Sequence, residues 1–132
     1  MFTHETPVRF GDTDAMGHVN NATFLTYLED TRVAFFRHVS GELIVLAGLI
    51  LARTEIDFVK PILFGVGPVR TTAWVERVGT KSFSMGYTME QDGAVVGRAV
   101  AVMVAYDYAA GASRPLTDEE KAALAPYAGG PA

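Results

Sequence analysis

Apolar residues recur at helical spacing in one long segment of the chain. From Asn21 onward they fall mostly three, four or seven positions apart, whereas charged residues lie on the wetter faces of the same segment. Ser40–Gly41 ends this pattern. The segment is therefore predicted to form a long helix with a bulky inner side, around which a sheet can wrap. The apolar positions of the helix are Phe24, Tyr27, Leu28, Phe35, Phe36 and Val39.

Five other segments have the patterns of β-strands. Pro7 lies within the first of them and indicates an edge strand, because proline cannot donate to a ladder. Asp92–Gly93 predicts a tight hairpin between the last two strands, and the last is apolar on both faces, which is typical of a central strand. The predicted strands are Thr3–Phe10, Ile50–Val59, Val69–Val78, Lys81–Gln91 and Ala94–Tyr106. Alternation in the second strand puts Ile50, Ala52, Thr54, Ile56 and Phe58 on one face.

The remaining segments are short. The apolar run Leu43–Ala47 is expected to pack as an extra turn near a pocket. Thr117–Glu120 has the sequence of a capping box and predicts a short helix that ends at Leu124. Gly129–Ala132 is expected to be frayed. With no repeat or linker to divide the chain, residues 1–132 are predicted to form one α+β domain.

Composition excludes several classes of function. A formal net charge of −4 and a pI near 5.3 disfavour nucleic acid and anionic membranes as partners. The absence of cysteine excludes disulfides, thiolate catalysis and cysteine metal sites. The chain lacks a signal-peptide pattern and an apolar stretch long enough to span a bilayer, so a cytoplasmic location is expected.

Most of the chemistry lies in the connection Asp12–Asn21, immediately before the long helix. Asn20 or Asn21 can cap the helix, and the amides left free at its first turn can hold an anion or a developing oxyanion. A nearby carboxylate such as Asp14 could then attack or deprotonate the polarised group. Each of these residues taken alone is more simply explained as a turn former. Together they suggest acyl chemistry.

The ordered string Asp12–Thr13–Asp14–Ala15–Met16–Gly17–His18–Val19–Asn20–Asn21 resembles the signature of hot-dog-fold acyl-CoA thioesterases of the 4-hydroxybenzoyl-CoA thioesterase type. Tyr27–Leu28–Glu29 and Arg32 continue the match. Later landmarks of that family are matched by Phe58–Pro61, Val78–Phe83 and Asp92–Gly93. The resemblance implies a hot-dog domain, in which a five-stranded antiparallel sheet wraps one long helix, and hydrolysis of an acyl-CoA to a free acid and CoA.

The resemblance also implies roles for individual residues. Asp14 corresponds to the catalytic carboxylate, acting as nucleophile or general base, and the Asn21 amide to the oxyanion donor. His18 and Asn20 are expected to position the water or the loop. No metal or redox cofactor is expected, since His4, His18 and His38 are scattered. Similar proteins form homodimers, often joined into homotetramers, with the active site at the subunit interface, and the same is expected here.

Substrate contacts are predicted for two groups of residues. The acyl pocket is expected to use residues near the helix start, namely Phe24, Tyr27 and Leu28, with Gly17 of the signature. The phosphates of coenzyme A are expected on basic residues, of which Arg77 and Lys81 are favoured because they flank the Gly79–Thr80 turn, next to Ser82. The further basic candidates are Arg53, Lys60 and Arg98.

Two other functions remain open at this point. A hot-dog hydratase or dehydratase would pair an aspartate with a nearby histidine, which Asp14 and His18 superficially offer. However, the asparagine follows the histidine here, and a His-Phe-Pro loop is absent. A non-catalytic acyl-CoA binding module would typically lack the acid or carry a DNA-binding segment, whereas this chain keeps Asp14.

Overall fold

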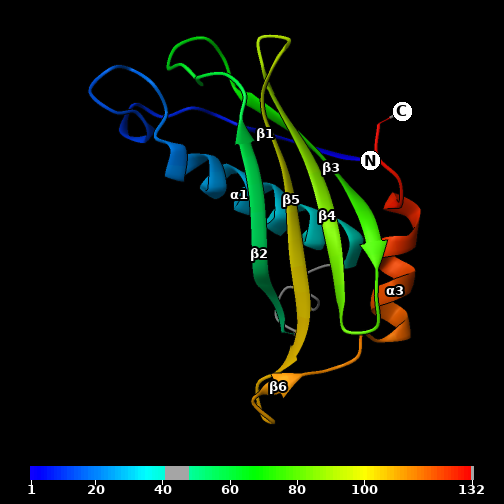
Figure 1. Ribbon diagram of the computed structural model, residues 1–132. Helices are drawn as coiled ribbons and strands as arrows, with labels where there is room; N and C mark the ends of the chain where they lie inside the picture. Colours follow the sequence, from blue (N-terminus) through cyan, green and yellow to red (C-terminus); the bar gives the residue numbers. More distant parts are fainter. Residues whose placement is uncertain (41–47, 132) are drawn as a thin grey trace.

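The computed structural model describes residues 1–40 and 48–131. It contains one long helix, one short helix and a curved antiparallel sheet (Figure 1). The predicted turn at Leu43–Ala47 lies outside the described residues. The helices are α1 (Asn21–Ser40) and α3 (Asp118–Leu124), with 3-10 turns η1 (Phe10–Asp12) and η2 (Ala125–Tyr127). The strands are β1 (Phe2–Thr6), β2 (Leu49–Phe58), β3 (Val69–Val78), β4 (Ser82–Gln91), β5 (Ala94–Asp107) and β6 (Ala112–Ser113).

The main sheet has the order β1-β3-β4-β5-β2, and every pairing in it is antiparallel. β1 lies at one edge, as Pro7 predicts, and β2 lies at the other. The two-residue β6 adds to the end of β5 and was not expected from the sequence. The five predicted strands and the long helix are therefore confirmed as an α+β architecture.

The sheet curls around α1 and buries one of its faces against that helix (Figure 1). β4 contributes large side chains to this core, whereas β5 contributes mainly alanines, which leave space for the helix. Phe36 of α1 meets Phe83 of β4 with ring centroids 6.2 Å apart. The core-facing side chains are Phe83, Met85, Tyr87 and Met89 of β4 and Ala99, Ala101, Met103 and Ala105 of β5. Phe35 and Phe36 are core residues, as predicted.

Two local signals correctly predict how elements begin and turn. Asp92 and Gly93 both have positive φ angles, 51° and 76°, as a two-residue hairpin turn of the primed type requires. The Thr117 hydroxyl accepts a hydrogen bond from the Glu120 amide, and the Glu120 carboxylate accepts one from the Thr117 amide. This reciprocal capping box starts α3, as predicted.

Two predictions near the ends of the chain are wrong. The first strand ends at Thr6 rather than Phe10, and Phe10 lies in η1 with 77% of its surface exposed. The tail is not frayed at Gly129, because the Gly129 amide donates to the Val75 carbonyl. Gly130 then packs against the Trp74 indole so closely that a side chain there would clash. The tail thus covers the part of β3 that β1 does not reach.

The predicted alternation of β2 is also interrupted. A bulge between Leu51 and Arg53 shifts the register against β5 by one residue. Ile50 consequently pairs with Val104 on the outer face, whereas Thr54 and the following alternate residues keep the helix-facing side. No described helix has both the length and the hydropathy needed to cross a membrane.

Candidate active site

The connection between η1 and α1 folds into a small closed loop. Thr13 and Val19 form an antiparallel bridge, and inside it the Asp14 amide donates to the His18 carbonyl over 2.7 Å. The Gly17 amide donates to the Asp14 carbonyl, and Gly17 has a φ of 78°, which a residue with a side chain rarely adopts. Gly17 therefore shapes the loop that presents Asp14.

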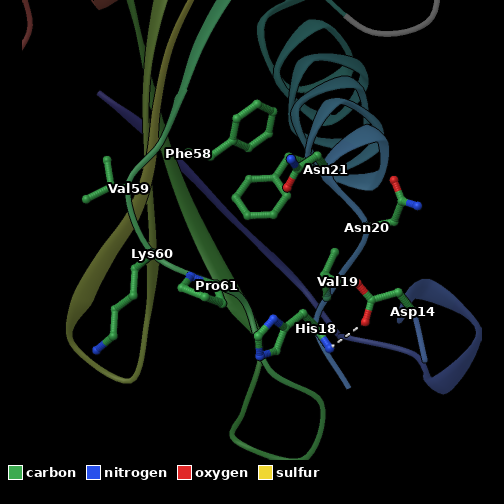
Figure 2. Close-up of a pocket in the computed structure, with 10 residues that line it drawn as sticks. Asp14, His18, Val19, Asn20, Asn21, Phe58, Val59, Lys60 and Pro61 are labelled. Carbon is green, nitrogen blue, oxygen red and sulfur yellow. Dashed lines mark hydrogen bonds between the residues drawn. The ribbon is translucent and has the colours of Figure 1, made fainter. Parts of the chain in front are cut away.

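Two backbone amides orient the Asp14 carboxylate. Its Oδ1 atom accepts hydrogen bonds from the amides of Met16, over 2.8 Å, and His18, over 3.2 Å. Figure 2 shows the bond from His18. Among the described residues, no donor occupies the other oxygen, Oδ2. One oxygen thus fixes the carboxylate to the loop while the second remains available to a ligand.

The start of α1 leaves one amide unused. Asn20, not Asn21, caps the helix, because its Oδ1 atom accepts a hydrogen bond from the Ala22 amide over 2.9 Å. The Asn20 amide donates to the Asp12 carbonyl, and the Thr23 amide donates to the Asn20 carbonyl. Within the described part of the chain the Asn21 amide makes no hydrogen bond. This is the position at which a helix start offers a donor to an oxyanion.

Asp12 ties the loop to the second turn of α1. The Tyr27 hydroxyl donates to Asp12 Oδ2 over 2.7 Å, and the Arg9 amide donates to the same oxygen. Burial alone would raise the pKa of Asp12, but the hydrogen bonds from Tyr27 and Arg9 outweigh it and lower that pKa. Burial and the neighbouring carboxylate raise the pKa of Tyr27, so its hydroxyl remains a donor. Asp12 is therefore part of the scaffold that holds Asp14 and Asn21.

Asp14 and Asn21 line a cavity of about 390 Å³ (Figure 2). The loop and the helix start form one side, and the end of β2 forms the other. Phe24 and Phe58 meet edge to face across the apolar part, with ring centroids 5.0 Å apart. The lining residues are Asp14, His18, Val19, Asn20, Asn21, Phe24, Phe58, Val59, Lys60 and Pro61.

The second side of the cavity is held by a bulge and by a buried glutamine. The Val96 carbonyl accepts hydrogen bonds from both the Val59 and Lys60 amides, next to a register shift between β4 and β5. Gln91, which is 6% exposed, bonds the Leu63 amide and carbonyl and the Gly67 carbonyl. The loop after β2 is thereby kept against the site, where the Val19 amide donates to the Ile62 carbonyl.

The sequence profile of the Thioesterase-like superfamily matches residues 8–124. The chain belongs to this superfamily. A structure described as a predicted thioesterase from Bacillus stearothermophilus is 26% identical, covers 99% of this chain and 98% of its own, and superimposes with a TM-score of 0.91. This likeness, over nearly the whole of both chains, confirms the hot-dog fold.

Two other relatives of this thioesterase-like chain are informative. A thioesterase from Thermus thermophilus, solved with coenzyme A and zinc, is 29% identical, with 98% of this chain and 96% of that chain covered and a TM-score of 0.87. The protein YsmA of Bacillus subtilis is 27% identical over 125 residues, which are 93% of this chain and 84% of YsmA. Both likenesses extend over more than nine-tenths of this chain.

The cavity brings together only part of the site predicted from the sequence. Asp14, His18, Asn20, Asn21, Phe24 and Lys60 all line it. The remaining predicted contacts, Gly17, Tyr27, Leu28, Arg77, Lys81 and Ser82, do not. Tyr27 is buried with its hydroxyl on Asp12, and Leu28 lines a smaller hollow farther along α1.

The turn between β3 and β4, which carries the favoured phosphate contacts Arg77 and Lys81, lies at the opposite end of the sheet from the loop of the site (Figure 1). Val69 begins β3 close to the loop of the site, and nine residues later the strand ends beside Arg77 and the following turn. At about 3.3 Å per residue, this separation is about 30 Å within one chain. Arg53 pairs with Glu55, and Arg98 lies opposite Asp57 in the β2–β5 ladder. Among the basic candidates, Lys60 alone lines the described cavity.

Sequence reasoning did not assign several residues to the site. Three of them line the cavity and belong to the family landmarks, namely Phe58, Val59 and Pro61. Their position at a strand end, next to Lys60, was the signal that could have indicated that they line the cavity. Gln91 carried no such signal, because its partners Leu63 and Gly67 are more than twenty residues away in the sequence.

Proposed function

We propose that this chain hydrolyses an acyl-CoA thioester to a free acid and CoA. The observation that supports this function most directly is a juxtaposition. Asp14 and Asn21 line the same cavity, and within the described part of the chain the Asp14 Oδ2 atom accepts no hydrogen bond and the Asn21 amide donates none. Membership of the Thioesterase-like superfamily supports the same reaction class.

In this proposal the Asn21 amide donates to the thioester carbonyl oxygen. Negative charge grows on that oxygen as the tetrahedral intermediate forms, so the donor stabilises the transition state more than the substrate. Because the amide has no partner among the described residues, no existing bond has to break when substrate binds. The partial positive charge of the α1 start acts in the same direction.

Asp14 supplies the second half of the chemistry by one of two routes. As a nucleophile, its free oxygen attacks the carbonyl carbon, CoA leaves as the thiolate, and water then hydrolyses the acyl-carboxylate anhydride. As a general base, it takes a proton from water while the oxygen of that water attacks the carbonyl, and the tetrahedral intermediate then collapses to the acid and expels CoA as the thiolate. Rapid quenching of a single turnover, followed by mass spectrometry of the protein, distinguishes the routes, since only the nucleophilic route passes through an acyl group bound to Asp14.

His18 and Asn20 serve the reaction by shaping the loop. The His18 amide holds Asp14, and its imidazole lies on the Pro61 side of the loop (Figure 2). The Asn20 side chain caps α1 and so fixes the direction of the neighbouring Asn21 amide. Asp14 thus bonds the His18 backbone and not its ring, which favours hydrolysis over a hydratase that needs an Asp–His pair.

We also propose that the chain works as a homodimer, or as a homotetramer built from two such dimers. The edge of β2 that faces away from β5 has no partner strand among the described residues. If two copies pair antiparallel along this edge, the far end of one sheet comes to the same end as Asp14 of the other. Arg77 and Lys81 of the second copy would then lie about three strand spacings, or about 14 Å, from the shared edge. Lys60 and these residues are the proposed contacts of the CoA phosphates.

The test is a panel of acyl-CoAs with short, branched, aromatic and long acyl groups, followed with a thiol reagent. Release of free CoA thiol at a rate that depends on the Asp14 carboxylate is the expected result. Hydration of an enoyl-CoA without thiol release would indicate a hydratase. Saturable binding of acyl-CoA with neither reaction would indicate a non-catalytic binding module.

A further inference from the structure

The cavity at the start of α1 has a polar part and an apolar part. Asp14 and Lys60 line the polar part, whereas Phe24 and Phe58 line the apolar part. An acyl-CoA has the same division, because a polar, anionic CoA moiety lies on one side of its thioester and an acyl chain lies on the other. If the thioester carbonyl binds the Asn21 amide, burial of the acyl chain therefore directs that chain toward the two phenylalanine rings.

The two rings close the apolar part of the cavity. They meet edge to face, with centroids 5.0 Å apart and an interplanar angle of 77°. Phe24 is 1% exposed and belongs to the core, and its ring lies over Gly97, where a Cβ atom would be 3.5 Å from the ring. Phe58 pairs with the same glycine in the β2–β5 ladder, and its ring points toward α1 (Figure 2). Phe24 is therefore a fixed part of the wall, whereas Phe58, which is 45% exposed, can be truncated without opening the core.

A second hollow continues along α1 and β2 beyond the two rings. It has a volume of about 150 Å³, and Leu28 of α1 and Thr54 of β2 are among the residues that line it. Leu28 lies about one helical turn after Phe24, and Thr54 lies four residues before Phe58 on the strand. The pair of rings thus stands between the cavity and this second hollow.

The position of the rings determines how much of an acyl chain the cavity can hold. Phe24 follows Asn21 by three residues, which is about 4.5 Å along the helix axis. A C–C bond is about 1.5 Å long and a zigzag chain advances by somewhat less per bond, so roughly three or four bonds span this distance. An acyl group of about four or five carbons, including the carbonyl carbon, therefore fits in front of the rings, and a longer group has to displace the ring of Phe58.

We propose that this chain acts on short-chain acyl-CoAs, with acyl groups of up to about five carbons, and that Phe58 sets this limit. The inference rests on the acyl-CoA function proposed above and adds the class of acyl group to it. Phe58 is then a specificity-determining residue, and Phe24 supports its ring from the core.

The experiment measures kcat/KM by release of CoA thiol for straight-chain substrates from acetyl-CoA to dodecanoyl-CoA. We expect the parent value to fall at least about tenfold between butyryl-CoA and octanoyl-CoA, since a single misfit methylene can cost that much. Phe58→Ala should raise the octanoyl-CoA value by about tenfold or more and leave the butyryl-CoA value within about threefold of the parent. Phe58→Leu keeps an apolar side chain, so its intermediate shift tests the limit even if the alanine variant does not fold.

Phe64→Ala is the matched control for this truncation. Phe64 is 50% exposed and meets Phe10 edge to face with ring centroids 5.8 Å apart, but it is not among the residues that line the described cavity. It should keep the chain-length profile of the parent. A parent that hydrolyses octanoyl-CoA as well as butyryl-CoA, a profile unchanged in Phe58→Ala, or an equal shift in Phe64→Ala would overturn the inference.

Binding measurements separate this inference from the proposed reaction. The affinities of the same acyl-CoAs are measured by calorimetry for Asp14→Asn and for Asp14→Asn/Phe58→Ala. If no acyl-CoA releases thiol, but affinity falls beyond about five carbons and recovers in the double variant, hydrolysis is wrong and the limit set by Phe58 stands. Affinity that depends on neither chain length nor Phe58 would overturn the limit even where thiol release is observed. Neither thiol release nor binding with any acyl-CoA would overturn both.

Discussion

Replacing Asn21 with proline removes the proposed oxyanion donor itself, which no other side-chain change at this position can do. Asn21 is the first residue of α1, where proline is well tolerated because the amide has no helical acceptor. Its amide makes no hydrogen bond among the described residues, so the free protein loses none. The residue before a proline prefers an extended backbone, and helix-capping residues such as Asn20 usually have that conformation.

The expected loss follows from what one such donor contributes. Removing a single oxyanion-hole hydrogen bond typically costs about 2.7–4 kcal/mol of transition-state stabilisation, or roughly a hundredfold to a thousandfold in kcat. Asn21→Ala is the matched control, because it keeps the amide. The cap belongs to Asn20, so the alanine variant should also keep the stability of α1. We expect its kcat to stay within a few-fold of the parent.

The assay is steady-state release of CoA thiol, with circular dichroism and sedimentation run on the same samples. We expect Asn21→Pro to keep the parent spectrum and oligomeric state and to lose activity mainly in kcat. A folded Asn21→Pro protein that hydrolyses acyl-CoA at close to the parent rate would rule out this amide as the donor. Equal losses in the proline and alanine variants would instead assign the effect to the side chain.

Three further predictions concern charges and hydrogen bonds. Asp14→Asn keeps the shape of the side chain but removes the anion, so it should abolish thiol release while acyl-CoA binding, measured by calorimetry, persists. Asp12→Asn should retain more activity than Asp14→Asn. The reverse order of activities would mean that the roles of the two aspartates are exchanged. Tyr27→Phe removes the hydroxyl that bonds Asp12, which should lower the free energy of unfolding by about 1.5–3 kcal/mol and reduce kcat more than it changes KM; an unchanged urea midpoint would contradict the role of this bond. Burial alone would raise the pKa of Glu120, but the hydrogen bonds from Arg114 and from the Thr117 amide outweigh it and lower that pKa. The stability that the Glu120 carboxylate provides should therefore be present above pH 4.5, the ordinary pKa of the group, and be lost as the pH falls through the lower pKa of the folded state. Urea titrations between pH 6 and about pH 3 should therefore show a steeper loss for the parent than for Glu120→Gln, and parallel curves would contradict this linkage.

The features that sequence predicts well are those that depend on neighbouring residues. The positive φ angles at Asp92–Gly93, the capping box at Thr117 and the apolar face of α1 all follow from local preference and period. The bulge after Leu51 does not, because it depends on how β2 meets β5 across the ladder. Gly130 likewise carries no local sign that it packs on Trp74, which lies more than fifty residues earlier.

The two aspartates of the site illustrate where local reasoning ends and tertiary structure decides. Asp12 and Asp14 are two residues apart, and turn chemistry alone gives each the same preference. Their surroundings differ because Asp12 meets Tyr27, fifteen residues later on α1, whereas among residues 1–40 and 48–131 the Asp14 carboxylate bonds only amides of its own loop. Both Asp12 oxygens are occupied by scaffold contacts, but Asp14 keeps one oxygen free beside the cavity. A carboxylate whose acceptors are all used can hold a loop, and one with a free acceptor can act on a substrate. The assignment of the catalytic role to Asp14 thus rests on the hydrogen bond that Tyr27 of α1 donates to the other aspartate, Asp12.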